Sequence, residues 1–209
     1  MHSIGPVILS ILVGYIVGSI SFAWLIGRSQ GIDIRKHGSG NVGATNVQRV
    51  LGRSLGRLCF VLDFAKGAVP VLIAQALTSA DSAWIPVVVG AAAVAGHVWP
   101  VTLRFKGGKG FATSLGVVAA LAPLCFIAAI VVWLGVFFSS RYVSLASIVA
   151  AAALPLTAHL LGWLSPLRIA PAVHILLWAV AALVALRHKS NIQRLIRGEE
   201  HQFNQGKKQ

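Results

Sequence analysis

Acidic side chains are scarce in this sequence, which has five Asp and Glu residues against 18 Lys and Arg residues in a chain of 209. We see no carboxylate cluster suited to Mg²⁺, so we expect an activity that needs neither a metal nor any other cofactor. Cysteine is also rare. Cys59 and Cys125 both lie in apolar stretches without metal-ligand spacing, which argues against a disulfide framework and against a zinc site.

Charged residues of either sign make up only 11% of the chain, whereas 56% of its residues are hydrophobic and the mean hydropathy is +0.79. Several apolar runs reach membrane-spanning length. We therefore expect residues 1–209 to form a single-domain, all-α polytopic bundle in a membrane. The net charge of +13 could suggest nucleic acid. The basic residues instead flank apolar runs in three short segments, which favours anionic lipid and anionic substrate as partners and no nucleic acid.

The apolar runs predict where the chain crosses the membrane. Residues 4–26 form the first span; no basic residue precedes this run and no small-residue cleavage site ends it, so we expect it to be retained. Further spans are expected at about 58–78, 84–103, 143–164 and 171–186, while the run 111–138 makes either one span or two.

Charge decides between six and seven spans. Six basic residues follow the first run and place that loop in the cytoplasm, with the N-terminus outside: Arg28, Arg35, Lys36, Arg49, Arg53 and Arg57. If Pro123 divides the run 111–138, the count is seven. The basic tail 187–209, including Lys207 and Lys208, then lies inside, and Arg168 alone faces out, in the last outer turn. Each half would be only ~20 Å long, yet we predict seven spans because six spans would put the basic tail outside.

The first polar loop, residues 35–49, is the main candidate for binding an anion. Gly38, Gly40 and Gly43 allow bends that turn N–H groups toward a ligand. The loop also carries short donors and cations: Ser39, Asn41, Thr45, Asn46, Arg35, Lys36 and Arg49. It matches G-x-G-x-x-G, but no strand precedes it, so a dinucleotide site is excluded on context. A plain solvated loop would also explain the glycines and cations, though not so many donors.

A second polar loop, residues 104–113, leads directly into an apolar helix. Its three basic residues and three glycines suit a phosphate held by backbone N–H groups at a helix N-terminus. It is not a Walker A motif, because Gly110 follows Lys109 where Ser or Thr is required. We prefer a phosphate cradle to a plain basic turn. Its candidate binding residues are Lys106, Gly107, Gly108, Lys109, Gly110 and Thr113.

Three further features lie near the same face of the membrane. Asp63 and Lys66 are spaced i, i+3 inside the second span, where they either serve function or neutralise each other; we favour the structural role. His97 precedes the helix-breaking Pro100 and is either a packing residue or a site candidate. Ser144 begins a later span, where it either faces the site or caps the helix.

The last polar segment follows the final span. Ile192, Leu195 and Ile196 recur at helical spacing and predict an amphipathic helix on the inner membrane surface. His188 and Asn191 then share one face of that helix, one turn apart.

Together these segments resemble the bacterial acyl-phosphate:glycerol-3-phosphate acyltransferases, the PlsY family, which are integral membrane enzymes that begin phospholipid synthesis. The resemblance covers essentially the whole chain, and its order is highly specific. It is carried by residues 38–49, 63–67, 96–97, 105–113 and 187–188, followed by Asn191 and Glu199.

The resemblance implies transfer of a fatty acyl group from acyl phosphate to the sn-1 hydroxyl of glycerol 3-phosphate, giving 1-acylglycerol 3-phosphate and phosphate. It also implies seven spans with the N-terminus outside, and an active site on the cytoplasmic face of the bacterial inner membrane. The enzyme that produces the acyl phosphate is an implied partner. The family lacks the His-x4-Asp box of other glycerolipid acyltransferases, and no histidine here has Asp five residues later.

The resemblance also assigns roles to residues. Catalysis falls to Ser39, Arg49, His188 and Asn191, and the glycine loop binds the phosphate of glycerol 3-phosphate. Glu199 supports the tail. Here Glu199 and Glu200 stand where Thr-Glu is common, so either glutamate could fill that role. Whether Ser39 is a nucleophile or a hydrogen-bond donor also stays open.

The main alternative is a small transporter for an organic phosphate or another anion. A transporter should place its binding groups near the bilayer midplane with access to both sides. The polar groups here are expected on one face. A phosphatidyl-type transferase is disfavoured because its repeated aspartates for a divalent metal are missing.

Overall fold

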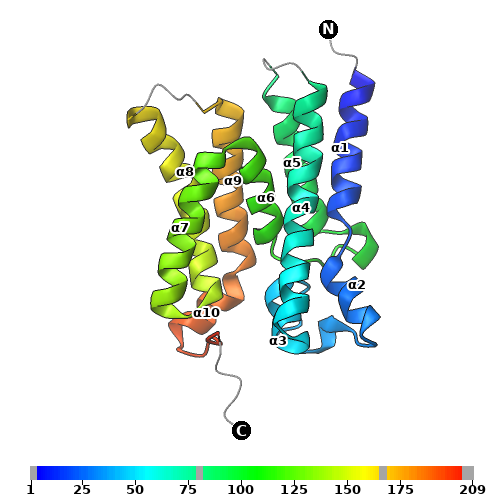
Figure 1. Cartoon of the computed structure of the whole chain (residues 1–209), viewed down its shortest axis with the longest axis vertical. Coiled ribbons are helices and arrows are strands. Elements are labelled where there is room, and N and C mark those ends of the chain that lie inside the picture. The colour runs from blue at the N-terminus through cyan, green and yellow to red at the C-terminus, as the bar shows by residue number, and fades with distance from the viewer. Residues whose placement is uncertain (1–3, 79–81, 165–168, 204–209) are drawn as a thin grey trace. The chain divides into compact units, whose positions relative to one another are not determined.

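The computed structural model describes residues 4–78, 82–164 and 169–203, and every regular element in these ranges is a helix (Figure 1). The predicted all-α class is confirmed. Asp81, Arg168, Lys207 and Lys208 lie outside the described residues. The contacts of the chain group it into two compact units, residues 1–121 and residues 122–209. The expectation of a single domain stays a prediction.

The first unit contains six α-helices among its described residues: α1 (Ile4–Gly18), α2 (Phe22–Ser29), α3 (Ala44–Leu51), α4 (Arg53–Leu77), α5 (Trp84–Val98) and α6 (Phe111–Leu121). Two short 3₁₀ turns join them, η1 (Ile34–Lys36) and η2 (Val101–Leu103). Helix α4 packs against α3, α5 and α6, and α1 packs against α5. At Gly67 a side chain would collide with the carbonyl oxygen of Thr113, so this glycine lets the start of α6 lie directly on α4.

The first apolar run, predicted as one span over residues 4–26, lies within one stretch long and apolar enough to cross a membrane, residues 4–29. The stretch contains a break, because α1 ends at Gly18 and α2 begins at Phe22. Two side chains from other parts of the sequence donate hydrogen bonds to backbone carbonyls at this break. The Thr102 hydroxyl donates to the Ser19 carbonyl at 2.6 Å, and Lys66 Nζ donates to the Ile20 carbonyl at 2.7 Å. The break is stable because these carbonyls regain hydrogen bonds that the helix no longer supplies.

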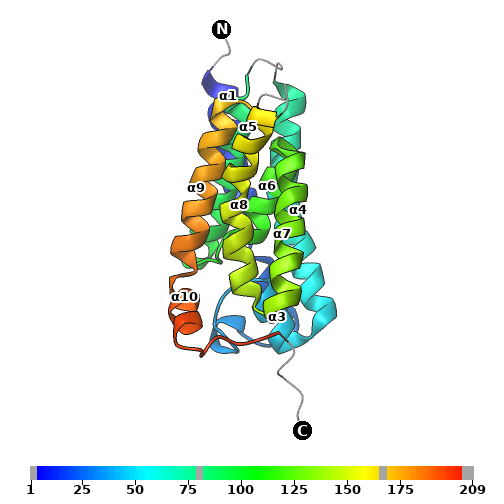
Figure 2. The same cartoon turned by 90° about the vertical axis from the view of Figure 1, so that its left-hand side faces the viewer.

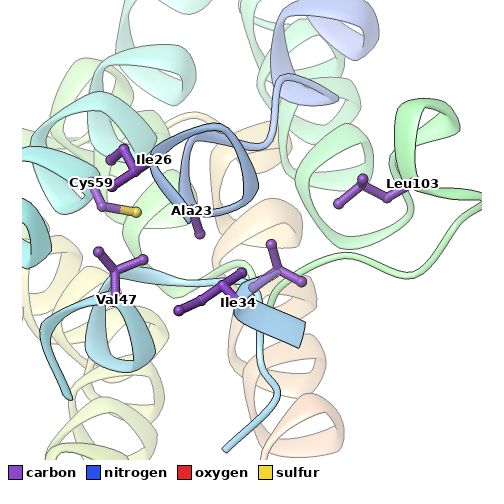
Figure 3. Close-up of a cluster of buried hydrophobic side chains, with 7 residues drawn as sticks. Ala23, Ile26, Ile34, Val47, Cys59 and Leu103 are labelled. Carbon is purple, nitrogen blue, oxygen red and sulfur yellow. The ribbon is translucent and has the colours of Figure 1, made fainter. Parts of the chain in front are cut away.

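A cluster of buried apolar side chains anchors the first polar loop (Figure 3). Ile34 of η1 and Val47 of α3 are both fully buried in it, and they meet Ala23 and Ile26 of α2 and Cys59 of α4. Leu103 of η2 completes the labelled set. The loop is therefore held at both ends by packing, because Ile34 just before it and Val47 near its end are both buried in this cluster.

The second unit contains α7 (Pro123–Ser140), α8 (Val143–Leu164), α9 (Pro171–Arg187) and α10 (Lys189–Ile196) among its described residues (Figure 2). Helix α8 packs against both α7 and α9. The predicted division of the run 111–138 at Pro123 is confirmed, because α6 ends at Leu121 and Pro123 opens α7. The predicted helix around 192–196 is confirmed as α10, which turns by 59° from α9.

The length and composition of the helices support fewer membrane spans than the seven predicted from charge. Within the described ranges, five helical stretches are long and apolar enough to cross a membrane: 4–29, 53–77, 84–103, 123–140 and 143–164. The bent pair α9 and α10 makes a sixth if it counts as one. Helix α6 is apolar, but its 11 residues extend only about 17 Å. Seven spans therefore stay a prediction.

Candidate active site

Asn46 organises the first polar loop from inside. Its side chain is 1% exposed, and its Nδ2 donates to the carbonyls of Ile34 at 3.2 Å and His37 at 3.0 Å. Its Oδ1 accepts from the backbone N–H of Ser39 at 2.8 Å. Asn46 was predicted to donate to substrate, but in the structure its amide shapes the loop that carries Ser39.

The other predicted residues of this loop lie at its surface. Ser39, Thr45 and Arg49 are exposed, and Asn41 is half-buried. Gly38 has a φ of 60°, and a side chain there would collide with Asn46 Oδ1, so only glycine suits this turn. The loop thus presents a hydroxyl, an amide and a guanidinium from a rigid frame.

Arg35 is already neutralised within the loop. Its Nη2 lies 2.7 Å from Asp33 Oδ2, and Asp33 also accepts from the Arg35 backbone N–H at 3.1 Å. The hydrogen bond from the Arg35 side chain holds the pKa of Asp33 well below its usual range. Arg35 was expected to offer its charge to an anion, but in the structure its guanidinium is paired with the Asp33 carboxylate.

The second polar loop is tied to the end of α5 by its own glycines. Gly107 N–H donates to the Val98 carbonyl and Gly108 N–H donates to the His97 carbonyl, both at 3.2 Å. These two N–H groups, which were expected to face a phosphate, therefore face the protein backbone. Lys106 is exposed, Lys109 is half-buried, and Gly110 is buried with a φ of 85° just before α6.

Two buried hydroxyls lie at the start of α6. Thr113 is 0% exposed and Ser114 is 2% exposed. Over the described part of the chain, neither hydroxyl has a hydrogen-bond partner. Thr113 was predicted to bind substrate, and its position at a helix N-terminus agrees with that role without testing it.

Asp63 and Lys66 form a buried ion pair, as their i, i+3 spacing suggested. Lys66 Nζ lies 2.8 Å from Asp63 Oδ1, and both side chains are 3% exposed. His97 Nδ1 lies 3.6 Å from the same oxygen, and Cys59 Sγ lies 3.7 Å from Asp63 Oδ2. The pair joins α4 to α5 and, through the Ile20 carbonyl, to the break between α1 and α2.

Glu200 is the hub of the second unit. Its Oε1 accepts from the Ser144 hydroxyl at 2.8 Å and from Asn191 Nδ2 at 2.6 Å. Its Oε2 accepts from Arg194 Nε at 2.7 Å. Glu199 is exposed. The supporting role assigned to Glu199 is therefore corrected to Glu200, because its carboxylate makes these contacts.

These contacts also set the charge of Glu200. Partial burial disfavours its ionised form, but the hydrogen bonds from Asn191, Ser144 and Arg194 outweigh that effect and lower the pKa of Glu200 below its ordinary value. Glu200 is held as a carboxylate, which accepts from all three donors.

His188 is buried at the junction of α9 and α10, 4% exposed. Its Nδ1 lies 2.8 Å from the Val184 carbonyl. A carbonyl only accepts hydrogen bonds, so Nδ1 carries the proton of the neutral ring and Nε2 carries the lone pair. Asn191, predicted to share its face, is also buried, at 5% exposed.

The segment after α10 makes contacts that sequence analysis missed. Gln202 Nε2 donates to the Tyr142 hydroxyl at 3.3 Å, and Phe203 N–H donates to the Arg141 carbonyl at 2.9 Å. The Phe203 ring meets Phe137 edge-on with ring centroids 5.1 Å apart. These partners are some 60 residues apart in the chain, so no local pattern could have paired them.

The structure brings the predicted residues together in two groups. Ser39 and Asn41 precede helix α3 and Thr45, Asn46 and Arg49 lie on it, so part of the predicted loop is helical; the same unit also carries residues 104–113 and the Asp63–Lys66 pair. Ser144, His188 and Asn191 lie in the second unit, and Glu200 connects Ser144 to Asn191. No group of three or more His, Cys, Asp or Glu side chains that could hold a metal ion occurs in the described ranges.

Comparison with known proteins gives consistent matches over nearly the whole chain. A family model described as glycerol-3-phosphate acyltransferase matches residues 8–198. The glycerol-3-phosphate acyltransferase of Aquifex aeolicus (strain VF5) is 46% identical over 195 residues, which cover 92% of this chain and 97% of the relative. That of Geobacter sulfurreducens is 44% identical over 191 residues, covering 91% and 94% respectively.

Two solved structures are also similar. Both are crystal structures of PlsY, described as an integral membrane glycerol 3-phosphate acyltransferase. Its glycerol 3-phosphate form has a TM-score of 0.89 at 44% identity, and its lysophosphatidic acid form has a TM-score of 0.86 at 43% identity. Each match covers 95% of this chain and 96% of the other.

Proposed function

We propose that this chain, which belongs to the glycerol-3-phosphate acyltransferase family, takes its acyl group from acyl phosphate and transfers it to the sn-1 hydroxyl of glycerol 3-phosphate. The chain is an integral membrane enzyme of lipid biosynthesis. The observation that carries the proposal is the 0.89 TM-score to a solved relative in its glycerol 3-phosphate form. The polar segments of the acyl-phosphate-dependent family, present here in order, support the choice of donor.

The chemistry suits the residues present. An acyl phosphate is a mixed anhydride, so the glycerol hydroxyl oxygen attacks the carbonyl carbon, the bond from that carbon to the phosphate oxygen breaks, and phosphate leaves. The enzyme mainly has to hold two anions, orient the hydroxyl and stabilise charge on the carbonyl oxygen. Arg49 and Lys109 supply positive charge for the anions. Ser39 and Asn191 donate hydrogen bonds to substrate oxygens.

His188 is the proposed general base. The lone pair on its Nε2 accepts the proton of the glycerol hydroxyl as the new ester bond forms. The contact of Nδ1 with the Val184 carbonyl supports this role, because it fixes the tautomer in which Nε2 accepts. Glu200 holds Ser144 and Asn191 in a defined orientation, and Asn191 follows His188 by one turn of helix.

The proposal for membrane topology follows from charge. Seven spans, an outside N-terminus and a cytoplasmic tail keep all the basic segments on the inner face of the bacterial membrane. The site then faces the cytoplasm, where glycerol 3-phosphate would enter from water and the acyl chain from the bilayer. Helices α6 and α7, separated at Ala122, supply the additional crossing.

The experiment that tests the reaction compares two donors. Purified protein in detergent is given radiolabelled glycerol 3-phosphate with palmitoyl phosphate or with palmitoyl-CoA, in EDTA. We expect labelled lysophosphatidate from palmitoyl phosphate alone. Equal product from palmitoyl-CoA would overturn the donor assignment. No product from either donor, in protein that is folded, would favour the transport alternative.

The role of His188 has its own test. We expect His188→Gln to lower kcat by about 10²-fold or more, the usual contribution of general acid–base catalysis. A loss below about tenfold would contradict the role of base. Quenching the enzyme with palmitoyl phosphate alone decides the role of Ser39, because an acyl group on Ser39 would reveal covalent catalysis and its absence would leave hydrogen bonding.

A further inference from the structure

We propose that His97 is a positioning residue for the glycine loop, residues 104–110, and thereby sets the affinity for the phosphate of glycerol 3-phosphate. The inference rests on the proposed function for the identity of that ligand. It concerns a buried histidine that neither holds substrate nor enters the reaction proposed above. The geometry around the ring carries the argument.

One nitrogen of the His97 ring faces a buried carboxylate. Nδ1 lies 3.6 Å from Asp63 Oδ1, and that carboxylate is itself fixed by Lys66 at 2.8 Å. Lys66 is fixed in turn by the Ile20 carbonyl. All three side chains are buried, at 3% exposed for Asp63 and for Lys66 and 6% for His97. A buried ion pair of this kind has few alternative arrangements, so the ring has one defined orientation.

The other ring nitrogen, Nε2, faces Gly108. A side chain at Gly108 would collide with His97 Nε2 and would lie within 3.0 Å of His97 Cε1, so only the bare glycine backbone fits against the ring. The same added atom would lie 2.7 Å from the Val42 carbonyl oxygen of the first polar loop. Gly108 is therefore packed between the imidazole and the first loop.

Backbone hydrogen bonds keep the loop against this support. Gly108 N–H donates to the carbonyl of His97 itself, and Gly107 N–H donates to Val98. Because these N–H groups face α5, the loop binds phosphate through Lys109 and the N-terminus of α6, which come next in the chain. Their position depends on where Gly108 rests, and a displacement of about 1 Å is enough to lose much of an oriented interaction.

Two substitutions separate the edges of the ring. In His97→Asn the amide nitrogen replaces Nδ1, so the contact with Asp63 is kept and the edge toward Gly108 is lost. In His97→Gln the amide nitrogen reaches the position of Nε2, so the edge toward Gly108 is kept. We expect His97→Asn to raise KM for glycerol 3-phosphate about tenfold, equivalent to about 1.4 kcal/mol. The value of kcat and the KM for palmitoyl phosphate should stay within about twofold.

His97→Gln should keep the KM for glycerol 3-phosphate within about threefold of the wild-type value. A folded His97→Asn protein with the wild-type KM for glycerol 3-phosphate would overturn the inference. A fall in kcat of His97→Asn at constant KM would overturn it as well. Gly108→Ala approaches the same contact from the loop without removing a buried polar group, and it should raise the same KM. Gly135→Ala on α7, where an added side chain meets nothing within 4 Å, is the matched control.

Binding of glycerol 3-phosphate without a donor separates this inference from the proposed function. We expect the ligand to raise the melting temperature of the wild-type protein and of His97→Gln, with His97→Asn needing about tenfold more ligand. A wild-type protein that glycerol 3-phosphate does not stabilise would contradict the proposed function. Equal stabilisation of wild type and His97→Asn would contradict the positioning role alone.

Discussion

Asn46 and Glu200 each hold several neighbours with a single polar side chain. Asn46 joins Ile34, His37 and Ser39 within the first polar loop. Glu200 joins Ser144, Asn191 and Arg194. Both act on residues proposed to touch substrate. Removing one partner from such a buried network leaves polar groups unsatisfied, which costs more than the hydrogen bond itself contributes.

Asn46→Asp is the most specific test of the first network. The substitution keeps the shape but replaces two donor hydrogens with a carboxylate oxygen that faces the Ile34 and His37 carbonyls. We expect a loss of stability of about 2–4 kcal/mol together with a loss of activity, measured by thermal unfolding and by the acyl phosphate assay. Ser54→Ala, an exposed substitution on α4, should change neither. An unchanged melting temperature in Asn46→Asp would contradict the role in shaping the loop.

At this scale the sequence did not predict which candidate residues are buried or which partners hold them. The residue types of the first loop indicated an anion site, but nothing local distinguished Asn46, which is buried, from Thr45, which is exposed. That difference depends on which face of α3 packs against the cluster in Figure 3. The choice between Glu199 and Glu200 likewise required Ser144, which lies 56 residues away.

Among the elements, the break between α1 and α2 depends on a side chain from α4. The Lys66 ammonium pairs with the buried carboxylate of Asp63 and donates to the Ile20 carbonyl, which has lost its helical partner at the break. The sequence showed the Asp63–Lys66 spacing, but it could not show the break, because residues 4–26 contain no proline after Pro6 and no charge. Gly18 ends α1 and Ser21 is the N-cap of α2, so local propensity contributes to the interruption, and the tertiary contacts of Thr102 and Lys66 complete it.

Lys66→Met should therefore destabilise the protein strongly. It leaves the Asp63 carboxylate buried without its partner, which typically costs about 3–5 kcal/mol. The double variant Asp63→Asn with Lys66→Met should be more stable than Lys66→Met alone, because no buried charge remains. Thermal unfolding of the three proteins in detergent measures the difference. A double variant less stable than the single one would show that Asp63 is stabilised without Lys66.

The segment after α10 should release at low pH. Since the pKa of Glu200 is lowered in the folded protein, its carboxylate adds stability above its ordinary value of 4.5, and this contribution is lost as the pH falls through the lowered pKa. We expect Glu200→Gln to be less stable than wild type at pH 7 and the difference to shrink below pH 4.5. Glu199→Gln, which changes an exposed carboxylate, is the control and should match wild type at every pH. A constant difference down to pH 3 would contradict this linkage.

For the whole molecule, the later apolar runs predicted their helices with small errors at the ends, whereas the break between α1 and α2 and the short helix α3 were not predicted. The helices α8 and α9 begin where the sequence placed them, and Pro123 divides α6 from α7 as expected. Turns were predictable because proline and glycine act locally. The number of membrane crossings could not be predicted in the same way. It depends on whether the 11-residue helix α6 crosses the membrane, and helix length alone does not decide that.

Cysteine labelling of the membrane-embedded protein decides the topology. Cys59 and Cys125 are both fully buried, so an impermeant maleimide should report introduced cysteines only. With seven spans, Gly5→Cys should react in intact spheroplasts, whereas Ser54→Cys and Glu199→Cys should react only after permeabilisation. All three positions are exposed. With six spans Glu199→Cys would react in intact spheroplasts and Ser54→Cys would not, because losing one crossing moves every later segment to the opposite side. Labelling of Glu199→Cys in intact spheroplasts would therefore contradict both the seven-span topology and a cytoplasmic position for His188 and Asn191.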